Sequence, residues 1–303
     1  MNFLETVFCG VTLKNPVVAA SGAYGFGRDY TDFYALEALG GISCKGTTFA
    51  PRLGNPPPRI AETAAGILNS VGLQNPGAAH FIEYDLPWLR AQNTVIIANA
   101  AGSSVEDYVE NVALLAAADV DMIELNISCP NVKEGGVAFG TSCASVEKIV
   151  SAVKKVCPKP LMVKLSPNVT NIVPIAQAAE AAGADALSLI NTLTGMKIDV
   201  AHRRPILHNN TGGLSGAAVL PIAVRMVWEV RRATQLPIMG MGGVTQWQNA
   251  AELILAGANA IQMGTAIFAD PYAPLKVIYG LAEWVEREGC NNISELSGQV
   301  RPW

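Results

Sequence analysis

The sequence feature that most constrains the fold is an alternation of short apolar runs with longer amphipathic stretches, repeated through nearly the whole chain. A short apolar run indicates a strand buried on both faces, and an amphipathic stretch of helical period indicates the helix leading to the next strand. Strands are expected at residues 16–20, 41–45, 95–99, 122–127, 160–165, 186–191, 237–240 and 260–264. Helices are expected most clearly at residues 104–118, 145–156, 172–182, 220–233, 247–256 and 272–287.

Eight such strands, with helices between most of them, predict an α/β fold: a (β/α)8 TIM barrel formed by residues 1–303 as a single domain. A doubly wound sheet is the alternative. The sequence lacks a G-x-G-x-x-G motif after a first strand and a P-loop, the nucleotide-binding motifs of such sheets. The connecting segments 49–93 and 192–218 are long. We expect them to be irregular, functional strand-to-helix loops at the C-terminal face of the barrel.

The composition argues against several classes of partner. The formal net charge is −4 and no Lys/Arg run is present, so nothing favours binding to nucleic acid or to an anionic membrane. No apolar stretch approaches the ~20 residues of a membrane helix. Glu5 stands where a signal peptide would carry positive charge, so we expect a cytoplasmic protein. Only 15% of the residues are charged, against about 25% in ordinary domains, which suggests a surface partly covered by another subunit.

The cysteines and histidines do not predict a metal site. The six cysteines lack C-x-x-C or C-x4-C spacing, which argues against a disulfide framework, a zinc site or an iron–sulfur cluster in this chain. The three histidines lack metal-ligand spacing. We expect no metal, and reduced, mostly buried thiols.

Polar residues or glycines follow all eight predicted strands, at the end of the barrel where such folds carry their active sites. They are Ser21 and Gly22, Lys45 to Thr47, Asn99, Asn126 with Ser128 and Cys129, Lys164, Asn191 and Thr192, Gly242 and Gly243, and Gly264 and Thr265. Any one Asn, Ser or Gly has an ordinary explanation as a turn former. Lys45 and Lys164 are harder to explain, because a buried lysine needs an anionic partner or ligand; extension of their ends into solvent is the alternative.

The glycines after the seventh and eighth strands indicate a phosphate site. Gly242-Gly243 and Gly264-Thr265 occupy the positions where barrels commonly bind phosphate through backbone N–H groups. Tight strand-to-helix turns are the alternative explanation for these glycines. The pattern at two strand ends favours a phosphorylated ligand.

Cys129 lies in the stretch NISCPNVKEGG, residues 126–136, directly after the fourth predicted strand. Pro130 disfavours helix at Cys129, and Gly135-Gly136 could serve as the hinge of a lid. An isolated cysteine in a reduced protein is more often an inert buried thiol than a reagent. The position of Cys129 favours a catalytic role only if the other strand ends form a site.

These motifs together resemble those of the class 1 dihydroorotate dehydrogenases. The similar elements are N-x-S-C-P-N after strand four, S-G after strand one, K-G-T-T after strand two, N-S-V-G-L-Q-N-P at residues 69–76 and the late glycine pairs. The resemblance covers essentially the whole chain. G-G-x-A-F-G at residues 135–140 is similar to subtype B, the NAD-linked enzyme, more than to the fumarate-using subtype A. Cys143, shortly after this motif, is assigned no role.

The resemblance implies the oxidation of dihydroorotate to orotate in de novo pyrimidine (UMP) biosynthesis. Cys129 would be the general base that removes a proton from C5 while hydride leaves C6 for N5 of FMN. FMN would contact Ser21, Lys45, Gly46, Asn99, Asn126, Lys164, Ile190, Gly216, Gly242, Gly243, Gly264 and Thr265, the last four nearest its phosphate. Orotate would contact Lys45, Asn69, Val71, Gly72, Leu73, Asn126, Asn191 and Thr192.

The resemblance also implies a partner. In subtype B an electron-transfer subunit that carries FAD and a [2Fe-2S] cluster assembles with a homodimer of the catalytic chain into a heterotetramer. This chain has neither a dinucleotide motif nor cysteines spaced for a cluster, so electrons bound for NAD would leave through such a partner.

Four alternatives remain open at this point. Two keep the half-reaction between the substrate ring and FMN. One is a dihydroorotate dehydrogenase that passes the electrons to fumarate, and the other is an FMN module like that of dihydropyrimidine dehydrogenase, which runs in the reverse direction. The third is a phosphate-binding aldolase that uses Lys164 as a Schiff base. The fourth is a non-catalytic binding barrel, which leaves both strand-end lysines unexplained.

Overall fold

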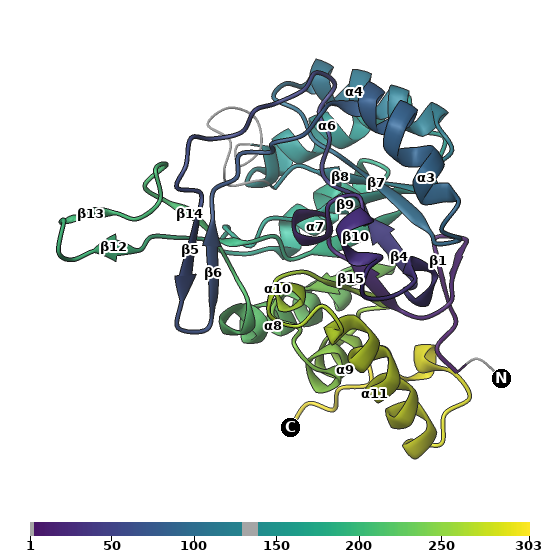
Figure 1. Ribbon diagram of the computed structural model, residues 1–303. Helices are drawn as coiled ribbons and strands as arrows, with labels where there is room; N and C mark the ends of the chain where they lie inside the picture. Colours follow the sequence, from purple (N-terminus) through teal and green to yellow (C-terminus); the bar gives the residue numbers. More distant parts are fainter. Residues whose placement is uncertain (1–2, 129–138) are drawn as a thin grey trace.

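The computed structural model describes residues 3–128 and 139–303. Eight parallel strands close into a barrel, and each overlaps one of the predicted runs (Figure 1). They are β3 (Val17–Ala19), β4 (Gly41–Ser43), β7 (Ile96–Ala100), β8 (Met122–Asn126), β9 (Leu161–Lys164), β10 (Ala186–Leu189), β15 (Ile238–Met241) and β16 (Ala260–Met263). Neighbours around the barrel follow chain order, and β16 pairs with β3 to close it. The predicted TIM barrel is confirmed and the doubly wound sheet is wrong; the assignment of residues 1–303 to one domain stays a prediction.

The six predicted helices are all present, with ends within two residues of those expected. They are α4 (Val105–Ala117), α6 (Cys143–Lys154), α7 (Val173–Ala181), α8 (Leu220–Arg231), α9 (Trp247–Ala256) and α11 (Ala273–Arg287). Helix α4 begins where the Ser104 hydroxyl accepts a hydrogen bond from the Asp107 N–H at 3.1 Å. Helices α7, α8 and α11 each have a proline in the first turn, where its missing N–H costs nothing. In the described part of the chain, no helix has the length and apolar composition to span a bilayer.

The remaining described helical segments are short, and all but α10 and η5, which follow the last strand β16, lie between barrel strands. They are α1 (Ser21–Tyr24), η1 (Arg28–Tyr30), η2 (Leu36–Ala38), α2 (Ala78–His80), η3 (Phe81–Asp85), α3 (Leu86–Arg90), η4 (Ala217–Val219), α10 (Ala266–Ala269) and η5 (Ile293–Leu296). Turn α1 takes the place of a full helix between β3 and β4. It brings Ser21 and Gly22 directly to the end of β3.

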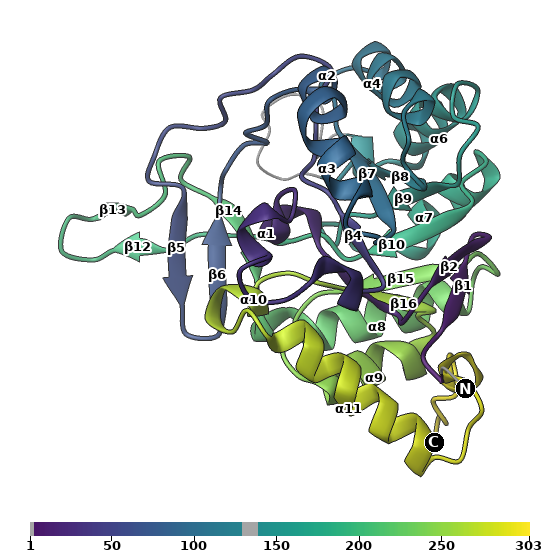
Figure 2. The same ribbon diagram turned by 45° about the vertical axis from the view of Figure 1, so that its right-hand side comes forward.

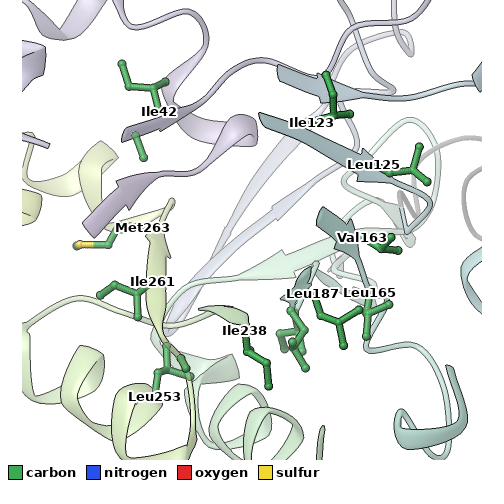
Figure 3. Close-up of a cluster of buried hydrophobic side chains, with 14 of the residues drawn as sticks. Ile42, Ile123, Leu125, Val163, Leu165, Leu187, Ile238, Leu253, Ile261 and Met263 are labelled. Carbon is green, nitrogen blue, oxygen red and sulfur yellow. The ribbon is translucent and has the colours of Figure 1, made fainter. Parts of the chain in front are cut away.

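The helices pack on the outer face of the barrel, and one large apolar cluster joins the two layers. Ile123, Val163 and Ile261 of the strands belong to this cluster together with Leu253 of α9 (Figure 3). Burying one aliphatic side chain of this size contributes about 1.5–3 kcal/mol. This layer of outward-facing residues accounts for the continuous apolar appearance of the strand sequences.

Inside the barrel the side chains form an apolar layer and, above it, a polar one. Residues two apart along a strand share a face, so these layers follow from alternate positions. The apolar layer contains Val18, Ile97, Met122, Met162, Ala186, Met239 and Ala260. The polar layer contains Ser43, Asn99, Glu124, Lys164, Ser188 and Gln262, all buried. The polar layer lies on the C-terminal side, where the strands end.

An N-terminal hairpin covers the opposite end of the barrel. Strands β1 (Thr6–Phe8) and β2 (Val11–Leu13) pair antiparallel. Phe8 and Leu13 are fully buried against the apolar interior layer. The hairpin therefore keeps water from the lower end of the barrel.

The two long connecting segments contain regular structure, which corrects the expectation of irregular loops. Strands β5 (Ile60–Thr63) and β6 (Gly66–Asn69) come from the first segment, and β11 (Leu193–Gly195) and β14 (Gly212–Ser215) from the second. They form one antiparallel sheet in the order β11-β14-β6-β5, beside the barrel (Figures 1 and 2). Strands β12 (Ile198–Asp199) and β13 (Arg204–Pro205) form a separate hairpin. Strand β5 pairs with β6 within the first segment and β11 with β14 within the second. The complete sheet also needs the pairing of β6 with β14, which joins segments far apart in the sequence.

Candidate active site

One cavity lies at the C-terminal ends of the barrel strands, and the sheet beside the barrel contributes one of its walls. The wall is made by Ile60, Ile67 and Leu214. Every predicted site residue that the structure describes lines this cavity. They are Ser21, Lys45, Gly46, Asn69, Val71, Gly72, Leu73, Asn99, Asn126, Lys164, Ile190, Asn191, Thr192, Gly216, Gly242, Gly243, Gly264 and Thr265. Residues separated by more than a hundred positions in the sequence thus meet in one place.

The floor of the cavity rests on the carboxylate of Glu124, which is completely buried. We call this residue and its five partners the Glu124 network. Hydrogen bonds reach the carboxylate from Ser43 Oγ at 2.7 Å, Asn99 Nδ2 at 2.6 Å, Ser188 Oγ at 2.8 Å and Gln262 Nε2 at 3.0 Å. The ammonium of Lys164, 5% exposed, lies 3.8 Å from a carboxylate oxygen.

The network keeps Glu124 ionised in the barrel interior. Burial by itself raises the pKa of a carboxyl group. The Lys164 ammonium and the hydrogen bonds from Ser43, Ser188 and Asn99 outweigh burial and bring the pKa of Glu124 below its ordinary value. The floor of the cavity therefore contains a matched pair of opposite charges.

A chain of side-chain amides leads from this floor to the wall of the cavity. Asn126 Nδ2 donates to Asn99 Oδ1 at 3.4 Å. The Asn126 Oδ1 atom in turn accepts from Ser128 Oγ at 3.2 Å and from Asn191 Nδ2 at 3.4 Å. Asn191 also donates to Ser128 Oγ at 2.8 Å. The amides occupy defined orientations, as a site for a flat ligand with its own amide groups requires.

Glycines at the ends of β15 and β16 form the opposite part of the cavity. Gly243 has a positive φ of 82°, and a Cβ atom there would lie 2.7 Å from the backbone N of Leu220. Only glycine fits this turn without strain. Thr265, after β16, donates its hydroxyl to Ser215 Oγ at 2.8 Å, which connects this rim to the sheet wall.

The segment after β6 presents Asn69, Val71, Gly72 and Leu73 to the cavity. Asn75 holds the segment in place: its Nδ2 donates to the Leu73 carbonyl at 2.7 Å, and its Oδ1 accepts from the Thr48 N–H at 3.1 Å. Thr48 follows the second barrel strand, so this side chain ties the segment to the barrel. The loop geometry is thus set by a residue outside the cavity.

Glu124 and Gln262 are important residues that the sequence analysis assigned no role. Each is one polar residue within an apolar strand, in MIELN and AIQM, and Ser188 in ALSL repeats the pattern. The sequence signal for such a residue is a single polar side chain in an apolar strand, at a position whose side chain points into the barrel. For Lys164 the sequence left an anionic partner, a ligand and extension into solvent open, and the structure gives it the partner Glu124.

Other expectations concern the segment after Ser128, Cys143 and metal binding. Cys129, with Pro130, Gly135 and Gly136, lies outside the described residues. Cys143, which was assigned no role, is the first residue of α6. Among residues 3–128 and 139–303, no group of three or more His, Cys, Asp or Glu side chains is arranged to bind a metal ion.

Known proteins with similar sequences bear the name of the family that the motifs resemble. The sequence profile described as dihydroorotate dehydrogenase matches residues 3–285. A protein of Alkaliphilus metalliredigens named dihydroorotate dehydrogenase B (NAD(+)), catalytic subunit, is 55% identical over 297 residues, 98% of each chain. Proteins of the same name from Bacteroides fragilis and Oceanobacillus iheyensis are each 52% identical over 289 residues, 95% of each chain. The chain belongs to the dihydroorotate dehydrogenase family.

Proposed function

We propose that this chain oxidises dihydroorotate to orotate in pyrimidine (UMP) biosynthesis, and that the cavity above the Glu124 network is its active site. The observation that carries the proposal is the convergence of all described motif residues on that one cavity. Membership of the dihydroorotate dehydrogenase family supports it. The names of the relatives, which specify NAD(+), favour NAD over fumarate as the final electron acceptor.

The residues of the cavity fit FMN, which the family implies as cofactor. The turn at Gly242 and Gly243, closed to larger side chains by Ile190 and Leu220, offers backbone to a phosphate. The Lys164 cation suits the edge of a flavin where negative charge develops on reduction. Ser21, Lys45, Gly46, Asn99, Asn126, Lys164, Ile190, Gly216, Gly242, Gly243, Gly264 and Thr265 would hold the cofactor. When bound, FMN supplies the acceptor for the hydride that leaves C6 of the substrate.

The orotate ring would lie among the amides and the segment after β6. Asn69, Asn126 and Asn191 offer side-chain amides that match the amide edges of the substrate. Lys45 would face the substrate carboxylate, with which a cation forms a strong charge-assisted hydrogen bond. Val71, Gly72, Leu73 and Thr192 would complete the contact. This arrangement would fix the orientation of the substrate ring in the cavity.

Cys129 is proposed as the base that accepts the C5 proton. It follows Ser128 in the chain, and Ser128 belongs to the amide chain described above. Loss of that proton and of hydride from C6 leaves the C5–C6 double bond of orotate. A free thiol has a pKa of ~8.5, and only the thiolate accepts a proton. The rate of substrate oxidation should therefore rise from neutral to alkaline pH.

The electrons would leave through a second subunit. The relatives are named catalytic subunits, which implies a further subunit. We propose that this partner carries FAD and a [2Fe-2S] cluster, passes electrons to NAD, and assembles with a homodimer of this chain. The cytoplasm is the proposed location.

The Schiff-base aldolase is disfavoured by the surroundings of Lys164. A Schiff-base lysine must react as a neutral amine. The ionised, fully buried Glu124 needs a cation beside it, and Lys164 lies 3.8 Å away. The pair therefore suits electrostatic stabilisation and not nucleophilic attack.

The visible spectrum of the purified protein tests the proposed function. We expect a yellow protein with flavin absorbance that bleaches when dihydroorotate is added without oxygen. NAD should be reduced only after an iron–sulfur flavoprotein subunit is added. A protein that binds no flavin, or whose flavin stays oxidised with dihydroorotate, contradicts the proposal.

A further inference from the structure

Glu124 connects much of the barrel interior, although it does not itself line the cavity. Its partners come from five other strands: Ser43 from β4, Asn99 from β7, Lys164 from β9, Ser188 from β10 and Gln262 from β16. Asn99, Lys164 and Gln262 line the cavity. The carboxylate thus contacts from below three side chains that a ligand meets from above.

The carboxylate determines which end of each amide faces which neighbour. An ionised carboxylate only accepts hydrogen bonds, so Asn99 must turn its NH2 group toward Glu124, at 2.6 Å. The Asn99 oxygen is then left to accept from Asn126 Nδ2, and the Asn126 oxygen to accept from Ser128 and Asn191. A neutral group in place of Glu124 could both donate and accept hydrogen bonds. The side-chain amides of Asn99 and Asn126 could then each adopt the flipped orientation.

The same carboxylate compensates the charge of Lys164. A lysine ammonium that is almost fully buried is costly without an anion nearby. Within residues 3–128 and 139–303, Lys164 forms its ion pair with Glu124. The position of the ammonium at the cavity floor therefore depends on the carboxylate.

Carboxylates elsewhere in the barrel have a different task. Asp121 and Asp185 precede β8 and β10 at the N-terminal end, where they accept from the backbone N–H groups of Ile96 and Leu161, both at 2.7 Å. Polar residues at that end of a TIM barrel serve stability. Glu124 accepts from side chains and lies at the end that carries the cavity, which separates it from this group.

We propose that Glu124 is a positioning residue that orients the amides of Asn99 and Asn126 and holds the Lys164 ammonium for the ligands of the cavity. This inference rests on the proposed function, because the ligands in question are FMN and orotate. Glu124 acts through its partners and touches neither ligand. Its loss should therefore change ligand affinity and flavin properties while leaving the barrel intact.

The experiment compares the full-length FMN-loaded wild type with Glu124→Gln, which keeps the shape but removes the charge and the acceptor-only character. Orotate affinity for the oxidised protein is measured by flavin absorbance titration, and the midpoint potential of bound FMN with reference dyes. Asp185→Asn is the matched control, a carboxylate-to-amide change at the opposite end of the barrel. For Glu124→Gln we expect orotate affinity to fall by about tenfold or more, and the potential to become more positive because Lys164 loses its counter-charge. Asp185→Asn should change neither.

The outcomes separate this inference from the proposed function. A wild-type protein that binds no FMN or no orotate overturns the proposed function. A folded Glu124→Gln protein with wild-type orotate affinity, or with an unchanged potential, overturns the role of Glu124 alone. If Glu124→Gln does not fold, Glu124→Asp replaces it. This shorter carboxylate keeps the charge but cannot span all its partners, so orotate affinity should again fall; wild-type affinity in Glu124→Asp overturns the inference.

Discussion

The ammonium of Lys164 lies 3.8 Å from a carboxylate oxygen of Glu124, and both side chains are shielded from water, with 7% and 0% exposed. Lys154 and Asp185 are closer together, at 2.6 Å, but more than a third of each side chain is exposed. The Lys164–Glu124 pair, although it is the longer of the two, matters more for the stability of the protein. Solvent screens an exposed pair, whereas a buried charge left alone has no water to compensate it.

Lys164→Met should therefore destabilise the protein far more than Lys154→Met. Removing one partner of a buried pair costs about 3–5 kcal/mol, and removing one partner of a partly exposed pair about 0–1 kcal/mol. Urea unfolding of the apoprotein variants measures both, without interference from a ligand. Equal losses of unfolding free energy in the two variants would show that the buried carboxylate does not require its cation.

The contribution of Glu124 to stability should depend on pH in a defined direction. Its folded pKa is lower than its ordinary value of 4.5, so the ionised form is favoured by folding. This contribution is complete above pH 4.5 and is lost as the pH falls through the folded pKa. The wild type should exceed Glu124→Gln in unfolding free energy by more at about pH 7 than at about pH 3.5. The difference in unfolding free energy between the two proteins is measured by urea unfolding. A difference of the same size at both pH values contradicts an ionised Glu124.

Gly243→Ala should impair FMN binding. Its φ of 82° disfavours alanine, and the added Cβ would lie 2.6 Å from Leu220 Cβ. Gly10→Ala is the matched control, because Gly10 has a similar φ of 79° but no neighbouring atom within 4 Å. Both variants should lose about 1–3 kcal/mol through backbone strain, and only Gly243→Ala should lose FMN. Flavin content after gel filtration measures this; full retention in Gly243→Ala would remove the phosphate assignment.

Cys129→Ser should slow substrate oxidation while retaining both FMN and orotate. A serine hydroxyl is a far poorer base than a thiolate, and a positioned base contributes about 10²–10⁴-fold. Stopped-flow measurement of flavin bleaching by dihydroorotate gives the rate. Cys143→Ser, at the start of α6, is the control and should react at the wild-type rate. A Cys129→Ser protein as fast as this control would mean that another group takes the proton.

Much of the architecture was predictable because it depends on local patterns. The strand around Ile123 and Leu125 reads as apolar since it packs under helices, and Ser104 and Asp107 mark the start of α4. The sheet beside the barrel was not predictable in this way. Gly213 pairs with Asn69 across a long stretch of chain, and no local pattern reports such a pairing.

The members of the site were predictable, but their mutual arrangement was not. Position at strand ends and similarity of motifs indicated Asn99, Asn126 and Lys164 as single residues. Their hydrogen bonds to one another and to Glu124 depend on the closure of the barrel. Glu124 is one polar residue in an apolar strand, and only the closed barrel surrounds it with side chains from five other strands.

By itself, the sequence determined the period of the strands and helices, and hence the barrel and the end of it that carries the site. These properties follow from which faces of each element must leave water, and that is encoded residue by residue. The tertiary structure alone decided the partners: the pairing of β6 with β14, and the placement of Glu124 beneath Lys164 and Asn99. A hydrogen bond or an ion pair requires two groups a few ångströms apart, and only the closed fold brings together groups that lie far apart in the chain.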